Sequence, residues 1–225
     1  MGCSHNSRHA LSLEHTQKGV CSRFCIAALS GGGGKTFLSL GLARLAKQMG
    51  YTVLPFKKGP DYIDAAWLAL AADLPCRHLD PFFMDPSALA RFYWQHVSAL
   101  DSAAQRCILL EGNRGLFDGM DSAGSCSTAE VAKAVNAPIL LVIDCKKMTR
   151  TVAALVQGVC AFDRDLSFCG LILNNVGTSR QAQLLREVLS LYSDIPLLGI
   201  IPRLADNPMP ERHMGLASTG DDFLA

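Results

Sequence analysis

The chain has almost no excess charge, few aromatic residues and no long apolar run. Its 225 residues include 21 basic and 20 acidic side chains, and aromatic residues make up 7%. A net charge of +1 gives no general attraction to nucleic acid, and no basic run carries the interleaved aromatics that bind it. No apolar stretch reaches the length of a membrane span. The sequence therefore predicts a cytoplasmic protein with neither a nucleic-acid nor a membrane partner.

A disulfide framework and a secretory signal are also missing. The nine cysteines are scattered, and several of them, such as Cys25, Cys107 and Cys145, lie inside apolar runs. This distribution is typical of buried thiols in a reducing compartment. Residues 1–22 hold histidines and cysteines without apolar periodicity or a hydrophobic signal segment. We expect a disordered leader there rather than a metal site.

Apolar residues, at 49% of the chain, are plentiful enough for one sizeable domain. Apolar runs without alternation, separated by amphipathic segments, predict a parallel sheet covered on both faces. We expect strands over 24–29, 52–56, 106–110, 138–143, 168–173 and 196–201. We expect helices over 37–49, 63–72, 87–100, 128–136, 149–161 and 179–191.

A glycine-rich turn joins the first predicted strand to the first predicted helix. It reads Ser30-Gly31-Gly32-Gly33-Gly34-Lys35-Thr36, the form of a phosphate-binding P-loop. Backbone N–H groups of such a loop converge on a phosphate, and the following helix adds its positive N-terminal end. Lys35 supplies a cation for the outer phosphates, and the Thr36 hydroxyl is placed to ligate Mg²⁺. The turn predicts an α/β, P-loop NTPase-like three-layer fold that binds nucleotide.

The loop departs from the standard spacing at one position. Leu29 stands where the first glycine of the P-loop pattern belongs. The alternative is a flexible glycine turn that binds nothing, although strand, glycines, Lys35–Thr36 and helix all fall in register. Ser30 stands where partition-type ATPases carry an extra lysine, which argues against that group.

Polar residues gather where the predicted strands end, and the carboxyl ends of parallel strands share one edge of the sheet. Lys57, Lys58, Asp61 and Asp64 follow the second strand, and a run from Glu111 to Asp118 follows the third. Asp144 and Asn174 end two more strands. Glu111 and Asp144 are rivals for the acidic residue of a Mg²⁺–nucleotide site, and either could instead cap a loop. From spacing alone, the two lysines could be solvated or could bind an anionic substrate.

Six ordered blocks resemble those of the cobyrinate a,c-diamide synthases. They are Pro55–Asp64 (PFKKGPDYID), Leu79–Pro81, Glu111–Gly119 (EGNRGLFDG), Ser127–Ala132, Leu173–Gly177 and Pro210–Leu216. The relatives that make cobyric acid lack the first block. Dethiobiotin synthetase shares the fold and a similar Glu-Gly turn, but lacks that block and the Leu-Phe-Asp-Gly run. The blocks indicate one synthetase domain over 23–216.

The resemblance implies an enzyme that uses ATP and Mg²⁺ to amidate the a and c acetate side chains of a tetrapyrrole, through an acyl phosphate, in cobalamin biosynthesis. It implies Thr36, Asp61 and Glu111 as Mg²⁺ ligands, and Asp64 as a residue that orders the loop or the metal's waters. It implies that Asp118 lies at the tetrapyrrole side and that Asn174 faces adenine. Lys57 and Arg114 are implied as partners for substrate carboxylates. It also raises the expectation of a homodimer.

Two departures keep alternatives open. Asn113–Arg114 replaces the Val-Met of many family members and resembles the branch that amidates nickel-sirohydrochlorin. The family continues into a C-terminal glutaminase, whereas here 217–225 is expected to be a tail or the start of a linker. Cys169–Gly170 opens a core strand and does not predict a glutaminase nucleophile. The chain would then use free ammonia or a separate glutaminase. The alternatives are a dethiobiotin-synthetase-like ligase and a non-catalytic ATP-binding regulatory module.

Overall fold

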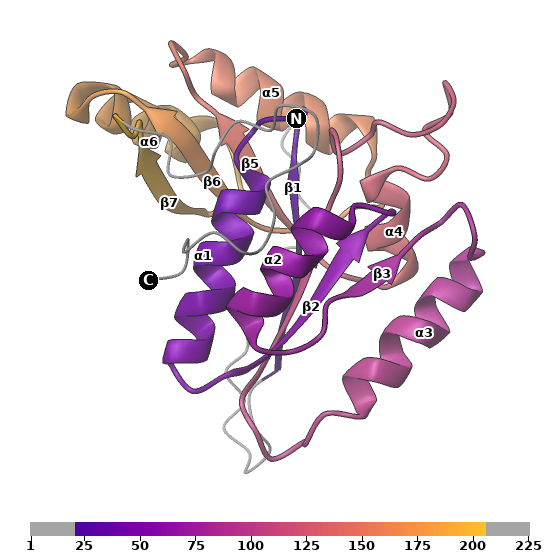
Figure 1. Cartoon of the computed structure of the whole chain (residues 1–225). Coiled ribbons are helices and arrows are strands. Elements are labelled where there is room, and N and C mark those ends of the chain that lie inside the picture. The colour runs from indigo at the N-terminus through magenta and orange to yellow at the C-terminus, as the bar shows by residue number, and fades with distance from the viewer. Residues whose placement is uncertain (1–20, 206–225) are drawn as a thin grey trace.

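A computed structural model describes residues 21–205 and places seven parallel strands in one sheet, in the order β3-β2-β4-β1-β5-β6-β7. The strands are β1 (Cys21–Ala28), β2 (Thr52–Lys58), β3 (Arg77–Leu79), β4 (Arg106–Glu111), β5 (Ile139–Asp144), β6 (Phe168–Val176) and β7 (Leu197–Pro202). The helices are α1 (Lys35–Gln48), α2 (Tyr62–Ala72), α3 (Pro86–Ser98), α4 (Thr128–Ala134), α5 (Thr151–Phe162) and α6 (Ser179–Tyr192). The three-layer fold with a parallel sheet is confirmed (Figure 1).

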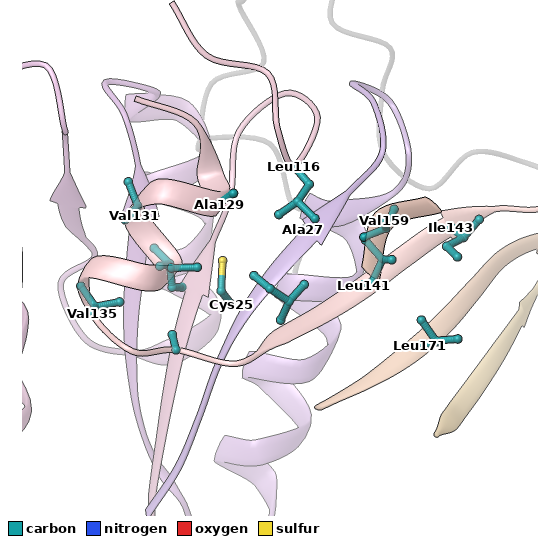
Figure 2. Packing of buried hydrophobic residues seen from close by; sticks show 14 of the residues in the cluster. Cys25, Ala27, Leu116, Ala129, Val131, Val135, Leu141, Ile143, Val159 and Leu171 are labelled. Atoms are coloured by element: carbon teal, nitrogen blue, oxygen red, sulfur yellow. The ribbon is translucent and has the colours of Figure 1, made fainter. Parts of the chain in front are cut away.

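Helices cover both faces of the sheet because alternate strand residues point to opposite faces. Ile26 and Ala28 of β1 pack in one buried cluster with residues of α1 and α2. Cys25 and Ala27, their neighbours in the chain, pack in a second cluster with residues of α3, α4, α5 and α6. Figure 2 shows part of the second cluster, with Leu116 lying near Ala27. The sheet therefore separates an α1/α2 face from an α3–α6 face.

Most predicted elements are present, and the differences lie at their ends. The first strand begins at Cys21, so Cys21 and Ser22 belong to the sheet rather than to a leader. The second strand runs through Lys57 and Lys58 instead of stopping before them. It does so because β3, which the sequence did not predict, pairs with Phe56–Lys58. A three-residue strand holding arginine and histidine gives no apolar signal of its own.

Several sequence features lie outside the described residues. These are the proposed leader up to residue 20, the block at 210–216 and the tail at 217–225. Within 21–205, eight cysteines are free thiols, and Cys25, Cys107 and Cys145 are buried as predicted. None of the helices in 21–205 combines the length and apolar character that a bilayer crossing requires.

Candidate nucleotide-binding and active site

The glycine turn wraps the N-terminus of α1 in the form that a P-loop requires. Gly34 precedes the helix with a φ of 94°, a conformation that L residues rarely adopt. A side chain at that position would also collide with the Asn174 amide, which donates to Gly33 O at 3.2 Å. Leu29 has no such positive φ and packs against the core, so the pattern's first glycine is not needed here.

Lys35 is held inside the loop. Its ammonium donates to Ser30 O at 3.1 Å and to Arg114 O at 2.6 Å, which joins the P-loop to the turn after β4. Burial lowers the pKa of Lys35, and the charge of Glu111 opposes that shift. A poorly solvated cation with only backbone carbonyls as partners is well placed to bind phosphate oxygens.

Glu111 lies at the centre of the site. It ends β4, is completely buried, and accepts hydrogen bonds at Oε1 from Thr36 Oγ1 and Lys57 Nζ, both at 2.8 Å. Its second oxygen, Oε2, is buried and has no hydrogen-bond partner among the described residues. A buried carboxylate oxygen left open beside a P-loop threonine fits Mg²⁺, which takes one or two carboxylates and completes its shell with phosphates and water. No three acidic, histidine or cysteine side chains gather as a metal cluster within 21–205, and this form of site does not need one.

Lys57 has protein carboxylates as partners. It is 1% exposed and donates to Asp64 Oδ2 at 2.7 Å as well as to Glu111. The family resemblance implies Lys57 as a partner for a substrate carboxylate. Because it lies within β2, on the α1/α2 face with Val53, its ammonium is instead used between two buried acids.

Asp61 and Asp64 come together at the start of α2. Asp61 caps the helix and accepts from Asp64 N at 3.2 Å. Asp64 is buried and reaches Lys57, which in turn reaches Glu111. The GPDYID block is thereby tied to the acidic residue that touches Thr36.

The loop after β4 runs beside the P-loop. Gly112 N donates to Ile26 O at 2.9 Å and Leu116 N to Ala28 O at 2.7 Å, so the loop continues to follow β1. Leu116 is buried and fixes the turn in the core. Asp118 Oδ2 accepts from Gly115 N at 3.0 Å. Arg114, with a φ of 53°, and Asp118 are both exposed on this turn, at the rim of the nucleotide site.

The geometry favours Glu111 over Asp144 as the acidic residue of the nucleotide site. Asp144 is exposed and accepts from Lys146 N at 3.0 Å and from Asn175 Nδ2 at 3.1 Å, so it caps its own loop. Asn174 contacts the P-loop as described above, and its contact with adenine stays a prediction.

Two features were missed in the sequence. The first is the burial of Lys58, which is 8% exposed although its neighbour in the chain is also a lysine. The second is a cavity of about 610 Å³ beside the loop after β3. Strand alternation could have separated the two lysines, had the strand been extended to include them. The cavity depends on how distant loops pack, and no local pattern signals it.

These features define a P-loop nucleotide-binding protein: a strand followed by a glycine loop, the enclosed Lys35, and the Glu111 carboxylate that accepts a hydrogen bond from Thr36. The sequence model of one family, the CobQ/CobB/MinD/ParA nucleotide binding domain, matches residues 24–216, and the chain belongs to this family. Among solved structures, chloroplast FtsY from Physcomitrella patens is similar at a TM-score of 0.53 and 18% identity, over 84% of this chain and 60% of FtsY. FtsY from Elizabethkingia anophelis, solved in complex with GDP, is similar at a TM-score of 0.52 and 16% identity, over 84% of this chain and 59% of that FtsY chain. At these identities the likeness concerns the fold alone.

Curated relatives are closer in sequence. A cobyrinate a,c-diamide synthase of Magnetococcus marinus is 45% identical over 199 residues, which are 88% of this chain and 42% of the relative. A hydrogenobyrinate a,c-diamide synthase of Brucella anthropi is 41% identical over 88% of this chain and 44% of the relative. A cobyrinate a,c-diamide synthase of Syntrophotalea carbinolica is 40% identical over 91% of this chain and 44% of the relative. The chain spans less than half the length of these relatives.

Proposed function

We propose that this chain is the synthetase part of an ATP-dependent carbon–nitrogen ligase that amidates the a and c acetate side chains of cobyrinate or a related tetrapyrrole. The observation that carries the proposal is the hydrogen-bonded row Thr36–Glu111–Lys57–Asp64. It connects the P-loop to the GPDYID and EGNRGLFDG blocks, so the residues that suggest the substrate meet those that suggest the nucleotide. The names of the relatives support the same reaction.

The chemistry proceeds in two transfers at each side chain. A substrate carboxylate oxygen attacks the γ-phosphorus of ATP, the bond to the β-phosphate oxygen breaks, and ADP leaves. Ammonia then attacks the carbonyl carbon of the acyl phosphate, and hydrogen phosphate leaves with the third ammonia proton to give the amide. Phosphorylation supplies the leaving group that a bare carboxylate lacks. Positioning and charge stabilisation are the protein's main contribution to phosphoryl transfer.

The described residues divide this work by position. Lys35 and the loop N–H groups would bind the transferring phosphate and offset its charge. Thr36 and Glu111, with Asp61 nearby in the sequence block, would hold Mg²⁺, which supplies charge neutralisation on the phosphates. Lys57 positions Glu111, and Asp64 positions Lys57. Asp118 would face the tetrapyrrole, and Asn174 the adenine.

The nitrogen of the amide would come from ammonia, either free or released by a glutaminase. A homodimer and a cytoplasmic location are part of the same proposal.

Mass spectrometry of tetrapyrroles tests the proposal. The protein is incubated with Mg-ATP and either cobyrinate or nickel-sirohydrochlorin, each with ammonium and separately with glutamine. Two successive mass losses of the size expected for acid-to-amide conversion, with ammonium only, are the expected result. The nickel substrate is included because Arg114 is the residue that points to it. Bound ATP with no amidation of any macrocycle would favour a regulatory nucleotide-binding module, and carboxylation of a diamine would favour a dethiobiotin-synthetase-like ligase.

A further inference from the structure

Lys58 is a buried cation that lacks a partner in the described part of the chain. It is 8% exposed, yet no hydrogen bond or ion pair joins its ammonium to another residue of 21–205, whereas Lys57 has two carboxylates. Most of the side chain is withdrawn from solvent, and a poorly solvated ammonium without an anion is costly. Burial lowers the pKa of Lys58, and the charges of Cys126 and Asp80 offset this only in part. The position is suited to an anion that comes from outside.

The two adjacent lysines lie on opposite faces of the sheet. Leu54 and Phe56 pack in the cluster on the α3–α6 face, and Lys58 follows them at the same two-residue spacing. Lys57 follows Val53 on the α1/α2 face, where α1 begins at the P-loop. Lys57 therefore lies on the α1/α2 face, together with the P-loop, and Lys58 lies on the α3–α6 face of the same strand.

A cavity of about 610 Å³ lies on the Lys58 side. Its walls come from the loop after β3, the start of α3, the 123–126 turn and α4. Phe82 and Phe83 line it, are 62% and 78% exposed, and stack edge to face with ring centroids 4.9 Å apart. Cys126 is also a lining residue, and Asp80, whose charge acts on Lys58, directly precedes the lining loop. Lys58 thus lies on the face of the sheet that carries this cavity, within electrostatic range of the residue before its aromatic wall.

Arg114 supplies a second uncompensated cation close by. A side chain on Gly59, next to Lys58, would lie 3.6 Å from the Asn113 amide, so the two turns touch. Arg114 is exposed, no described carboxylate pairs with its guanidinium, and its charge acts on Lys58.

The acidic groups around the cavity are already engaged. Glu130 pairs with Lys133 at 2.7 Å, Asp85 caps α3, and Asp121 accepts from Ala123 N and Ser125 N. Asp80 accepts from Phe82 N at 3.0 Å. These hydrogen bonds hold the carboxylates of Asp80, Asp85 and Asp121 in place but leave their negative charges. Lys58 and Arg114 remain without a carboxylate partner among the described residues.

We propose that Lys58 and Arg114 bind peripheral carboxylates of a flat, apolar, polycarboxylate macrocycle whose face lies on the Phe82–Phe83 wall of this cavity. The inference rests on the proposed function and deepens it, because it moves the substrate anchor from Lys57 to Lys58. It also places the nucleotide on the α1/α2 face of the sheet and the macrocycle on the α3–α6 face.

Equilibrium binding of cobyrinate, followed by its visible absorbance in a filtration or dialysis assay, tests the site without turnover. Lys58→Met should weaken binding at least about tenfold, the loss expected for one charge-assisted contact, while Lys58→Arg keeps most of it. Phe83→Ala, on an exposed residue, should also weaken binding. Lys47→Met, a lysine of α1 paired with Asp73, is the matched control and should bind as the wild type does. ATP affinity should be the same in all four variants.

Cysteine alkylation gives an independent readout. Bound cobyrinate should slow alkylation of Cys126 inside the cavity and leave exposed Cys21 unaffected, as mapped by peptide mass spectrometry. If the wild type binds and amidates cobyrinate but Lys58→Met binds equally well, or Cys126 is not protected, the site is wrong and the proposed function stands. If the wild type neither binds nor amidates any tetrapyrrole, the proposed function fails and this site fails with it. A Lys58→Met protein that does not fold leaves the decision to Phe83→Ala and to Cys126 protection.

Discussion

The ammonium of Lys57 lies 2.8 Å from a carboxylate oxygen of Glu111, and both side chains are withdrawn from solvent, at 1% and 0% exposure. Lys57 and Glu111 are also direct neighbours in the β2–β4 register. The acidic residue that touches the P-loop threonine is therefore fixed by the sheet itself rather than by a mobile loop.

Removing the Lys57 charge should destabilise the fold as well as the site. Lys57→Met leaves Glu111 and Asp64 buried without their cation, and breaking a buried pair from one side costs about 3–5 kcal/mol. Denaturant unfolding should show a midpoint far below that of Lys47→Met, which removes an exposed ion pair worth about 0–1 kcal/mol. Equal midpoints for the two variants would contradict a structural role of the Lys57 pair.

Gly34→Ala should abolish nucleotide binding by distorting the P-loop. Its φ of 94° strains any side chain, and the new methyl group would strike the Asn174 amide. Gly41→Ala, within α1 and with open space around it, should bind nucleotide normally and gain up to about 1 kcal/mol of stability. Calorimetric titration with Mg-ATP measures the nucleotide affinity of both variants, and denaturant unfolding measures the stability of Gly41→Ala. Wild-type affinity in Gly34→Ala would refute the assigned loop geometry.

Glu111→Gln should weaken the dependence of ATP binding on Mg²⁺. The amide removes the charge that the open Oε2 position would offer to the ion, while a hydrogen-bonding oxygen remains for Thr36. Asp144→Asn is the matched control, since Asp144 is exposed and only caps its loop. ATP titrations across a range of Mg²⁺ concentrations compare the two. A loss of Mg²⁺ dependence in Asp144→Asn instead would reverse our assignment.

Core thiols should react slowly at neutral pH. Burial raises the pKa of Cys107 and Cys169 to about 11 and that of Cys145 to about 12. The thiolate is the reactive form, so alkylation of these residues should stay low at pH 8 and rise as pH approaches those values. Exposed Cys21 should be alkylated before the other cysteines of residues 21–205 in the folded protein. Time-resolved labelling with peptide mass spectrometry measures the order, and early labelling of Cys145 would contradict its burial.

The sequence predicts the part of this protein that depends on local pattern. Uniform apolar runs at 106–110 and 138–143 predict buried parallel strands, and the glycine turn predicts the P-loop between β1 and α1. Glu111 and Asp144 both become candidates because each ends such a run. The same rule failed for Lys57 and Lys58, because charged residues at a strand end resemble the start of a loop. Only their pairing with β3 and β4 extends the strand.

The cavity and the row of ionic contacts depend on residues far apart in the chain. Lys57 meets Glu111 across 54 positions, and Lys35 meets the Arg114 carbonyl across 79. Spacing along the sequence says nothing about such distances. The family resemblance supplied the residue set, but the carboxylate partners of Lys57 become visible only in three dimensions.

The opposite orientation of Lys57 and Lys58 sets limits on how this segment can evolve. Position 58 can exchange its side chain, and in the proposed site so adjust which macrocycle binds, without touching the ion pair that position 57 maintains. A gain or loss of one residue within β2 is different, because it would turn every following side chain to the opposite face. The segment should therefore tolerate substitution at 58 and resist any change in length.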